Sequence, residues 1–229
     1  FVWAIAEDGT VYGTHSIEEG QIYFNTQVWS VLSGAATPDQ VRDCLASVKE
    51  KLATPYGLML CAPPFIYASR NIMTSVVYPA GIKENAGIFN HTQGWGVIAE
   101  IMRGNGDQAY EYLKAALPAA YNTKAEVRQS EPYVIGQTTY SSVSPRAGNT
   151  RVSWLSGAAT WNYYSITQYM LGIRPQYDGL LLDPCLKSDW DGFTADRRWR
   201  GMNLHIEVKN PQHVNKGIEY IEVDGKKIE

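Results

Sequence analysis

The sequence lacks the hallmarks of several large protein classes. Its three cysteines, Cys44, Cys61 and Cys185, form no CxxC pair and no even framework, which favours free buried thiols in a reducing compartment. No stretch of about 18 apolar residues is present, so we expect no transmembrane helix, and no secretory signal is visible. The net charge is −3 without a cluster of Lys and Arg, which gives no indication of nucleic-acid binding.

Motifs for nucleotide and metal chemistry are also missing. There is no GxxxxGK[ST], no GxGxxG after a predicted strand and no HExxH. The four histidines lack the spacing of metal ligands, so we predict neither a metal nor a cofactor. Aromatic residues, in contrast, are abundant, with seven Trp and fifteen Tyr. Such side chains stack on carbohydrates, although a role as a large core residue explains any single one equally well.

Helical patterns dominate from about residue 19 to 172. Apolar spacing and capping signals predict helices over 19–34, from Thr37-Pro38-Asp39 onwards, over 92–103, from an N-cap near Asp107 onwards, and over 157–171. Consecutive helices joined by long polar loops predict helical hairpins in a toroid, with the site on loops at one end. The loops at 54–91 and 122–155 are long enough to be functional.

After residue 173 the pattern changes to that of strands. We predict short strands at 180–182, 193–200, 204–208 and 220–223, the last two with alternating apolar and polar residues. Asp224-Gly225 predicts a hairpin turn. The sequence therefore predicts a mainly α protein in two parts, a helical part over 1–173 and a small antiparallel β domain over 174–229.

The densest functional pattern is the stretch Lys83-Glu84-Asn85-Ala86-Gly87-Ile88-Phe89-Asn90-His91. His91 lies at a predicted helix start, where backbone N–H groups favour an anion and an imidazole adds a donor, although it could simply cap the helix. Glu84 suits a sugar hydroxyl or could serve as a general acid. The carboxylate pair Glu18-Glu19, at another expected helix start, we interpret as structural.

A second candidate anion site is Ser156-Gly157, with Ser156 as a possible helix N-cap, although a plain helix start would look the same. Gln137 and Tyr140 offer donors on the second long loop, and Arg146 and Arg151 could meet a phosphate. A glycosidase usually needs two carboxylates, whereas an inverting phosphorylase needs one acid because phosphate replaces the activated water. Two anion sites and one prominent loop carboxylate favour the phosphorylase.

Four motifs in order then show a specific resemblance across essentially the whole chain: Lys83-Glu84-Asn85-Ala86-Gly87-Ile88-Phe89-Asn90-His91, Glu131-Pro132-Tyr133-Val134-Ile135-Gly136-Gln137, Trp154-Leu155-Ser156-Gly157, and Leu171-Gly172-Ile173-Arg174-Pro175 with Asp183-Pro184-Cys185. Together they resemble the inverting disaccharide phosphorylases of glycoside hydrolase family 94. The resemblance implies part of an (α/α)6 barrel followed by a C-terminal β domain, in a cytoplasmic homodimer. The implied reaction converts a β-linked glucose disaccharide of the cellobiose type, with inorganic phosphate as co-substrate, into α-glucose 1-phosphate and a free sugar, with inversion.

The resemblance also implies residue roles. His91, Ser156, Gly157 and Gln137 would bind phosphate, with Gln137 at the border between phosphate and sugar. The sugar would contact Tyr78, Lys83 and Glu84, so Glu84 becomes a sugar ligand rather than the acid.

Two departures from the family pattern matter. The general acid of the family is an aspartate in a Trp-Asn-Asp motif, which is absent here, and the chain starts without Met; we therefore expect a C-terminal portion that needs the upstream half of the enzyme for activity and stability. Thr74 and Thr92 are short residues that suggest a wider acceptor pocket. A laminaribiose or other β-glucoside phosphorylase, an inverting glycosidase and a non-catalytic sugar-binding fragment stay open as alternatives.

Overall fold

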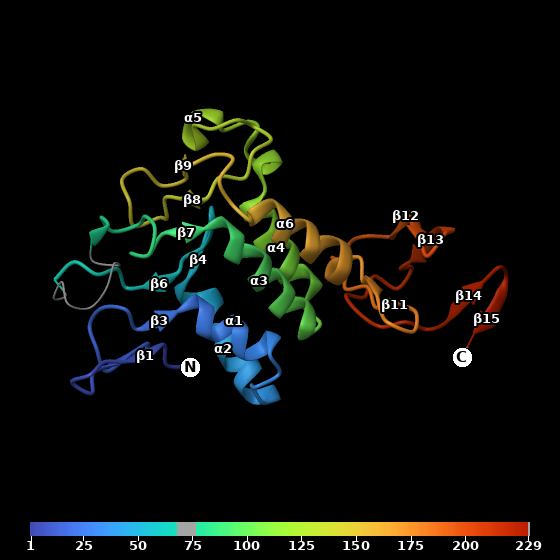
Figure 1. The fold of residues 1–229 in the computed structure, drawn as a ribbon, viewed down its shortest axis with the longest axis horizontal. Helices are drawn as coiled ribbons and strands as arrows, with labels where there is room; N and C mark the ends of the chain where they lie inside the picture. Colours follow the sequence, from blue (N-terminus) through green and yellow to red (C-terminus); the bar gives the residue numbers. More distant parts are fainter. Residues whose placement is uncertain (68–76, 229) are drawn as a thin grey trace.

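The structure, a computed structural model, describes residues 1–67 and 77–228. A group of packed helices forms its body, and hairpins at the C-terminal end extend to one side of it (Figure 1). The helices are α1 (Phe24–Leu32), α2 (Pro38–Lys51), α3 (Asn90–Met102), α4 (Gly106–Ala116), the 3-10 helix η3 (Pro118–Tyr121), α5 (Ala125–Arg128), α6 (Ala158–Tyr164) and the π-helical continuation η4 (Ser165–Met170).

Helix α3 lies at the centre of the body and packs against α1, α4 and α6. Most of its residues are buried, including the polar Asn90, Gln93 and Glu100, so α3 is covered by the rest of the protein on nearly every side. Gly94 allows the close approach of α6, because a Cβ at this position would lie 2.8 Å from the Trp161 carbonyl oxygen. Helix packing therefore places the start of α3 beside the start of α6.

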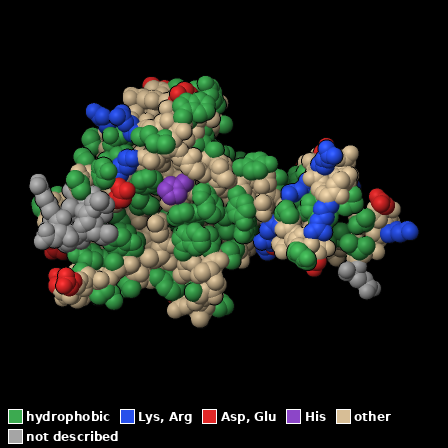
Figure 2. Space-filling view, viewed as in Figure 1, with side chains coloured by type: hydrophobic (Ala, Val, Ile, Leu, Met, Phe, Trp, Pro, Cys, Tyr) green, Lys and Arg blue, Asp and Glu red, His purple; other side chains and the backbone are tan. Residues whose placement is uncertain are grey.

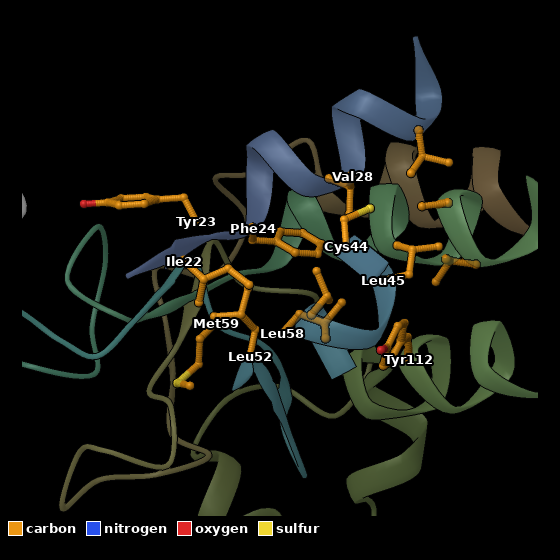
Figure 3. Packing of buried hydrophobic residues seen from close by; sticks show 14 of the residues in the cluster. Ile22, Tyr23, Phe24, Val28, Cys44, Leu45, Leu52, Leu58, Met59 and Tyr112 are labelled. Carbon is orange, nitrogen blue, oxygen red and sulfur yellow. The ribbon is translucent and has the colours of Figure 1, made fainter. Parts of the chain in front are cut away.

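The hydrophobic core fills the space between α1, α2 and α4. Phe24 and Val28 of α1 face Cys44 and Leu45 of α2 (Figure 3). All three cysteines are free and buried, as the sequence predicts. The predicted start of α2 is also confirmed, because Thr37 and Gln40 form a reciprocal capping box with Pro38 in the first turn.

Short antiparallel strands connect the loops around the helices. They are β1 (Ala4–Ile5) with β2 (Val11–Tyr12), β3 (Ile22–Tyr23) with β6 (Cys61–Ala62), β4 (Ala53–Thr54) with β5 (Gly57–Leu58), and a three-stranded sheet of β7 (Ile88–Phe89), β8 (Thr138–Thr139) and β9 (Thr150–Arg151). The three-stranded sheet matters most for the candidate site, because it joins the two long loops at 54–91 and 122–155.

The C-terminal region consists of three hairpins: β10 (Ile173–Pro175) with β11 (Leu180–Leu182), β12 (Gly192–Trp199) with β13 (Met202–Lys209), and β14 (Ile221–Val223) with β15 (Lys226–Ile228). The predicted turn at Asp224-Gly225 is confirmed, and both residues have positive φ. This region contacts the start of α4, where the Ser188 N–H donates to the Asp107 carboxylate at 2.7 Å.

The predicted start of the first helix is wrong. The helix begins at Phe24 rather than 19, and Glu19 lies outside it and accepts hydrogen bonds from the N–H groups of Ile66 and Tyr67 at 2.7 and 2.9 Å. The predicted helix start near Asp107 is confirmed, with Asn105 as the N-cap whose side chain accepts from the Gln108 N–H. Short strands also lie within residues 1–173, because the two long loops pair with one another.

None of the helices within residues 1–67 and 77–228 combines the length and hydrophobicity needed to span a bilayer.

Candidate functional site

The residues that precede α3 form a tight turn. Lys83 and Ala86 adopt positive φ angles of 53° and 57°, and the Gly87 N–H donates to the Lys83 carbonyl at 3.1 Å. A side chain at Gly87 would collide with the backbone of Lys83, so glycine is required there. The strained conformation at two non-glycine residues presents Lys83 and Glu84 side by side, and such strain is concentrated at functional sites.

Strands β7 and β8 bring the second long loop to this turn. Phe89 pairs with Thr138, and the Asn90 N–H donates to the Gln137 carbonyl at 2.9 Å. The buried Asn90 side chain reinforces the pairing by donating to the Gly136 carbonyl at 2.8 Å. The loop that carries Gln137 is therefore held against the start of α3 by backbone and side-chain hydrogen bonds.

This pairing unites two of the predicted site residues. The Lys83 ammonium group donates a hydrogen bond to Oε1 of Gln137. It also lies 5.7 Å from the centroid of the Phe89 ring, within the range of a cation–π interaction. Both side chains are half-buried, so their polar ends are oriented by the protein yet accessible to a ligand.

Glu84, beside Lys83, has a buried carboxylate oxygen, Oε2, with no hydrogen-bond partner among the described residues. A buried polar atom without a partner costs free energy, so such an atom needs an explanation. A ligand hydroxyl would supply the missing donor. Glu84 is therefore suited to hold a sugar hydroxyl.

His91 lies in the first turn of α3. The N-cap of this helix, Phe89, makes no side-chain capping bond. The imidazole meets the rings of Phe89 and Trp95 edge-on, with centroid distances of 5.5 and 5.3 Å. Burial lowers the pKa of His91, so at neutral pH the imidazole is uncharged and carries one N–H donor. A helix start with a neutral donor fits an oxyanion.

Ser156 and Gly157 precede α6. The N-cap is Gly157 and not Ser156, which corrects the sequence prediction, but the Ser156 hydroxyl still accepts from the Ala158 N–H at 3.0 Å. Helices α3 and α6 both begin on the side of the body that carries β7–β9 (Figure 1). They are coupled by the edge-to-face contact of Trp95 and Trp161, with centroids 5.7 Å apart.

Tyr78 joins the site through its backbone. Its carbonyl accepts a hydrogen bond from the Asn85 side chain at 2.8 Å, while the residue as a whole is 38% exposed. Thr74 lies outside the described residues. Thr92 is buried, and its hydroxyl donates to the Phe89 carbonyl at 2.9 Å, so it is engaged within the helix start. Arg146 and Arg151 are exposed.

Sequence reasoning missed the buried amides that hold the site together, namely Asn85, Asn90 and Gln93. Gln93 binds both backbone groups of Leu58, 35 residues away in the sequence. For Gln93, a polar residue inside a predicted helix was the available signal, but its partner could not be read from the pattern. Within residues 1–67 and 77–228, no group of three or more His, Cys, Asp or Glu could hold a metal ion.

Aromatic side chains cover the face beside the site. Trp95 of α3 meets both Trp29 of α1 and Trp161 of α6 edge-on. Trp29 is exposed. Figure 2 shows hydrophobic side chains spread over the same helices. A hollow of about 320 Å³ lies elsewhere, between α4, η3 and the β4–β5 hairpin. None of the predicted site residues lines it.

Comparison with known proteins agrees with the resemblance. The model of the catalytic domain of the glycosyl hydrolase 94 superfamily matches residues 1–172. N,N'-diacetylchitobiose phosphorylase of Vibrio proteolyticus is 35% identical over 229 residues, which are all of this chain and 29% of that protein. Solabiose phosphorylase of Paenibacillus borealis is 31% identical over 228 residues, again the whole chain and 30% of that protein. Cellobionic acid phosphorylase of Neurospora crassa is 29% identical over 213 residues, covering 91% of this chain and 27% of that protein. The chain thus spans about 30% of the length of these relatives.

Proposed function

Because the chain belongs to the glycosyl hydrolase 94 superfamily, we propose that it forms part of an inverting disaccharide phosphorylase. The observation that carries the proposal is the hydrogen bond from Lys83, the neighbour of Glu84, to the side chain of Gln137. The backbone carbonyl of Gln137 in turn accepts from the Asn90 N–H at the start of α3, beside His91. This arrangement puts groups suited to sugar hydroxyls next to groups suited to an oxyanion.

In the proposed site, phosphate binds at the starts of α3 and α6. His91 donates its imidazole N–H, and Ser156 and Gly157 contribute a hydroxyl and exposed backbone. Gln137 stands at the border between phosphate and sugar. Lys83 and Glu84 bind hydroxyls of the sugar, and Tyr78 lines the same subsite. The neutral state of His91, favoured by its burial, avoids the need to desolvate a charged imidazole before phosphate arrives.

In the proposed reaction a phosphate oxygen attacks the anomeric carbon from the face opposite the leaving sugar. The glycosidic C–O bond breaks as the new C–O bond to phosphate forms, which inverts the configuration, and a general acid protonates the leaving oxygen. The 229 residues contain no Trp-Asn-Asp. We assign the acid to a part of the enzyme outside this chain, since the relatives are far longer.

The proposed substrate class is a β-linked disaccharide. Cellobiose is the first candidate from the sequence, with laminaribiose and other β-glucosides as alternatives. The relatives named above act on diacetylchitobiose, solabiose and cellobionic acid, which adds amino-sugar and acidic disaccharides to the panel to be tested.

For the architecture we propose that residues 1–173 are part of an (α/α)6 barrel and that 174–229 are a separate β domain in a homodimer. The family match over 1–172 and the strand-rich hairpins after Ile173 support this division. The aromatic face of α1, α3 and α6 would pack against the remaining helices of the barrel.

The test is an assay of the chain together with the remainder of the enzyme, on the disaccharide panel, with and without inorganic phosphate. We expect a sugar 1-phosphate to form only when inorganic phosphate is present. Release of two free sugars at a rate independent of phosphate would instead identify a glycosidase, and sugar binding without turnover would identify a non-catalytic protein.

A further inference from the structure

The Asn85 side chain, in the turn that carries Lys83 and Glu84, is fully hydrogen-bonded. It is 1% exposed. Its Oδ1 accepts from the Phe65 N–H at 2.7 Å, and its Nδ2 donates to the carbonyls of Phe65 and Tyr78, each at 2.8 Å. Both amide protons and the acceptor are therefore used, and one side chain connects two separate points of the chain.

The backbone of Asn85 belongs to the turn that presents Lys83 and Glu84. Its N–H donates to the Ile82 carbonyl at 3.2 Å, and its carbonyl accepts from the Gly81 N–H at 2.7 Å. Tyr78 reaches the same turn through the Asn85 amide. The relative position of Tyr78 and the Lys83-Glu84 pair therefore depends on Asn85.

We propose that Asn85 is a positioning residue of the sugar subsite. It acts through Tyr78, Lys83 and Glu84, and so determines the affinity for the acceptor sugar; this inference rests on the proposed phosphorylase function. A shift of about 1 Å in such a group is sufficient to change catalytic parameters strongly.

The phosphate side of the site is held by other means. His91 is part of α3, and Ser156 and Gly157 precede α6. A change at Asn85 should therefore raise the KM for the sugar and leave the KM for phosphate unchanged.

The decisive variant is Asn85→Asp, which keeps the size of the side chain and the acceptor for the Phe65 N–H. The carboxylate has no protons for the carbonyls of Phe65 and Tyr78, so both bonds are replaced by repulsion. Asn210→Asp is a matched control, because buried Asn210 likewise donates to two carbonyls, of Trp190 and Val214, and accepts from the Val214 N–H. It lies in the C-terminal region, apart from the site.

Both variants are made in the complete enzyme. The KM for the acceptor is measured in the synthetic direction, from sugar 1-phosphate and free sugar, and the KM for phosphate in phosphorolysis, together with kcat and Tm. We expect Asn85→Asp to raise the acceptor KM about tenfold or more, with the phosphate KM within about twofold of wild type. Asn210→Asp should lower Tm and leave both KM values unchanged.

If Asn85→Asp lowers only Tm, as the control does, Asn85 has a purely structural role and the inference is overturned. Asn85→Ser, which retains one donor and one acceptor, serves if the aspartate variant does not fold; an unchanged acceptor KM in folded Asn85→Ser also overturns it. Failure of the wild-type enzyme to form sugar 1-phosphate would overturn the proposed function, and the inference with it. If the wild type forms sugar 1-phosphate but the Asn85 variants keep the acceptor KM of the wild type, the role of Asn85 is rejected and the proposed function stands.

Discussion

The Lys83 ammonium group and the Gln137 side-chain carbonyl are hydrogen-bonded although 54 residues separate them in the sequence. The contact exists because β7 and β8 pair, and this pairing brings the loop between α5 and β8 to the turn before α3. It joins two side chains that we place on the sugar side of the site and at its border with phosphate.

Lys83 and Gln137 should act as a unit. Each of Lys83→Ala and Gln137→Ala should raise the KM for the acceptor sugar. The loss of binding free energy in the double variant should be smaller than the sum of the two single losses, with a coupling free energy of about 0.5–3 kcal/mol. The measurement is a double-mutant cycle in the complete enzyme. Lys114→Ala, on α4, combined with Gln137→Ala is the control pair and should be additive. Additivity of the Lys83 pair would show that the contact has no energetic role.

His91→Ala should raise the KM for phosphate about tenfold to a hundredfold, because it removes a hydrogen bond to a charged ligand worth about 1.5–3 kcal/mol. Initial rates as a function of phosphate concentration provide the test. The control is His15→Ala, at an exposed histidine, which should leave the phosphate KM unchanged. An unaltered phosphate dependence in His91→Ala would contradict the proposed role of this residue.

Gly94→Ala should destabilise the protein and weaken phosphate binding together. The added Cβ would lie 2.8 Å from the Trp161 carbonyl oxygen, so α3 and α6 must move apart. Overpacking of this kind costs about 1–3 kcal/mol in the free energy of unfolding. Thermal unfolding and the phosphate KM are the two readouts. Gly179→Ala, where no atom lies within 4 Å of the added Cβ, is the control and should change neither. A fall in Tm without a change in phosphate KM would argue that α6 does not carry part of the phosphate site.

Glu100 should make stability depend on pH. Burial raises the pKa of this carboxyl group, against the opposing effect of Arg103, with which it forms an ion pair at 2.8 Å. Since the folded state binds the proton more tightly than the unfolded state, the stabilisation is present at pH values below the unfolded pKa of about 4.3 and is lost as pH rises through the raised folded pKa. Glu100→Gln cannot lose a proton, so its stability relative to wild type should increase over this range.

Urea unfolding of wild type and Glu100→Gln at several pH values from about 4 to 7 measures this difference. Glu50→Gln, at an exposed position of α2, is the matched control and should not show the trend. A difference between wild type and Glu100→Gln that stays constant with pH would mean that burial does not control the ionisation of Glu100.

Local features of the fold could be predicted because their contacts span only a few residues. The capping box of Thr37 and Gln40, the hairpin turn at Asp224-Gly225 and the strands on either side of it depend on neighbours along the chain. The start of α1 could not, because residues 22–23 pair with Cys61 and Ala62 and so form a strand instead of a helical turn. Glu19 was misplaced for the same reason, since its partners lie 47 and 48 residues further along the chain.

The candidate site divides in the same way. The sequence by itself determined which chemical groups are present, the family to which they belong, and that His91 opens a helix, because these follow from residue types, order and short-range spacing. Only the tertiary structure decided that Lys83 meets Gln137, that Glu84 has a buried oxygen with no partner among the described residues, and that Asn85 connects Phe65 and Tyr78 to the turn. These relationships come from strand pairing and helix packing between distant segments, which side-chain periodicity along one segment does not encode.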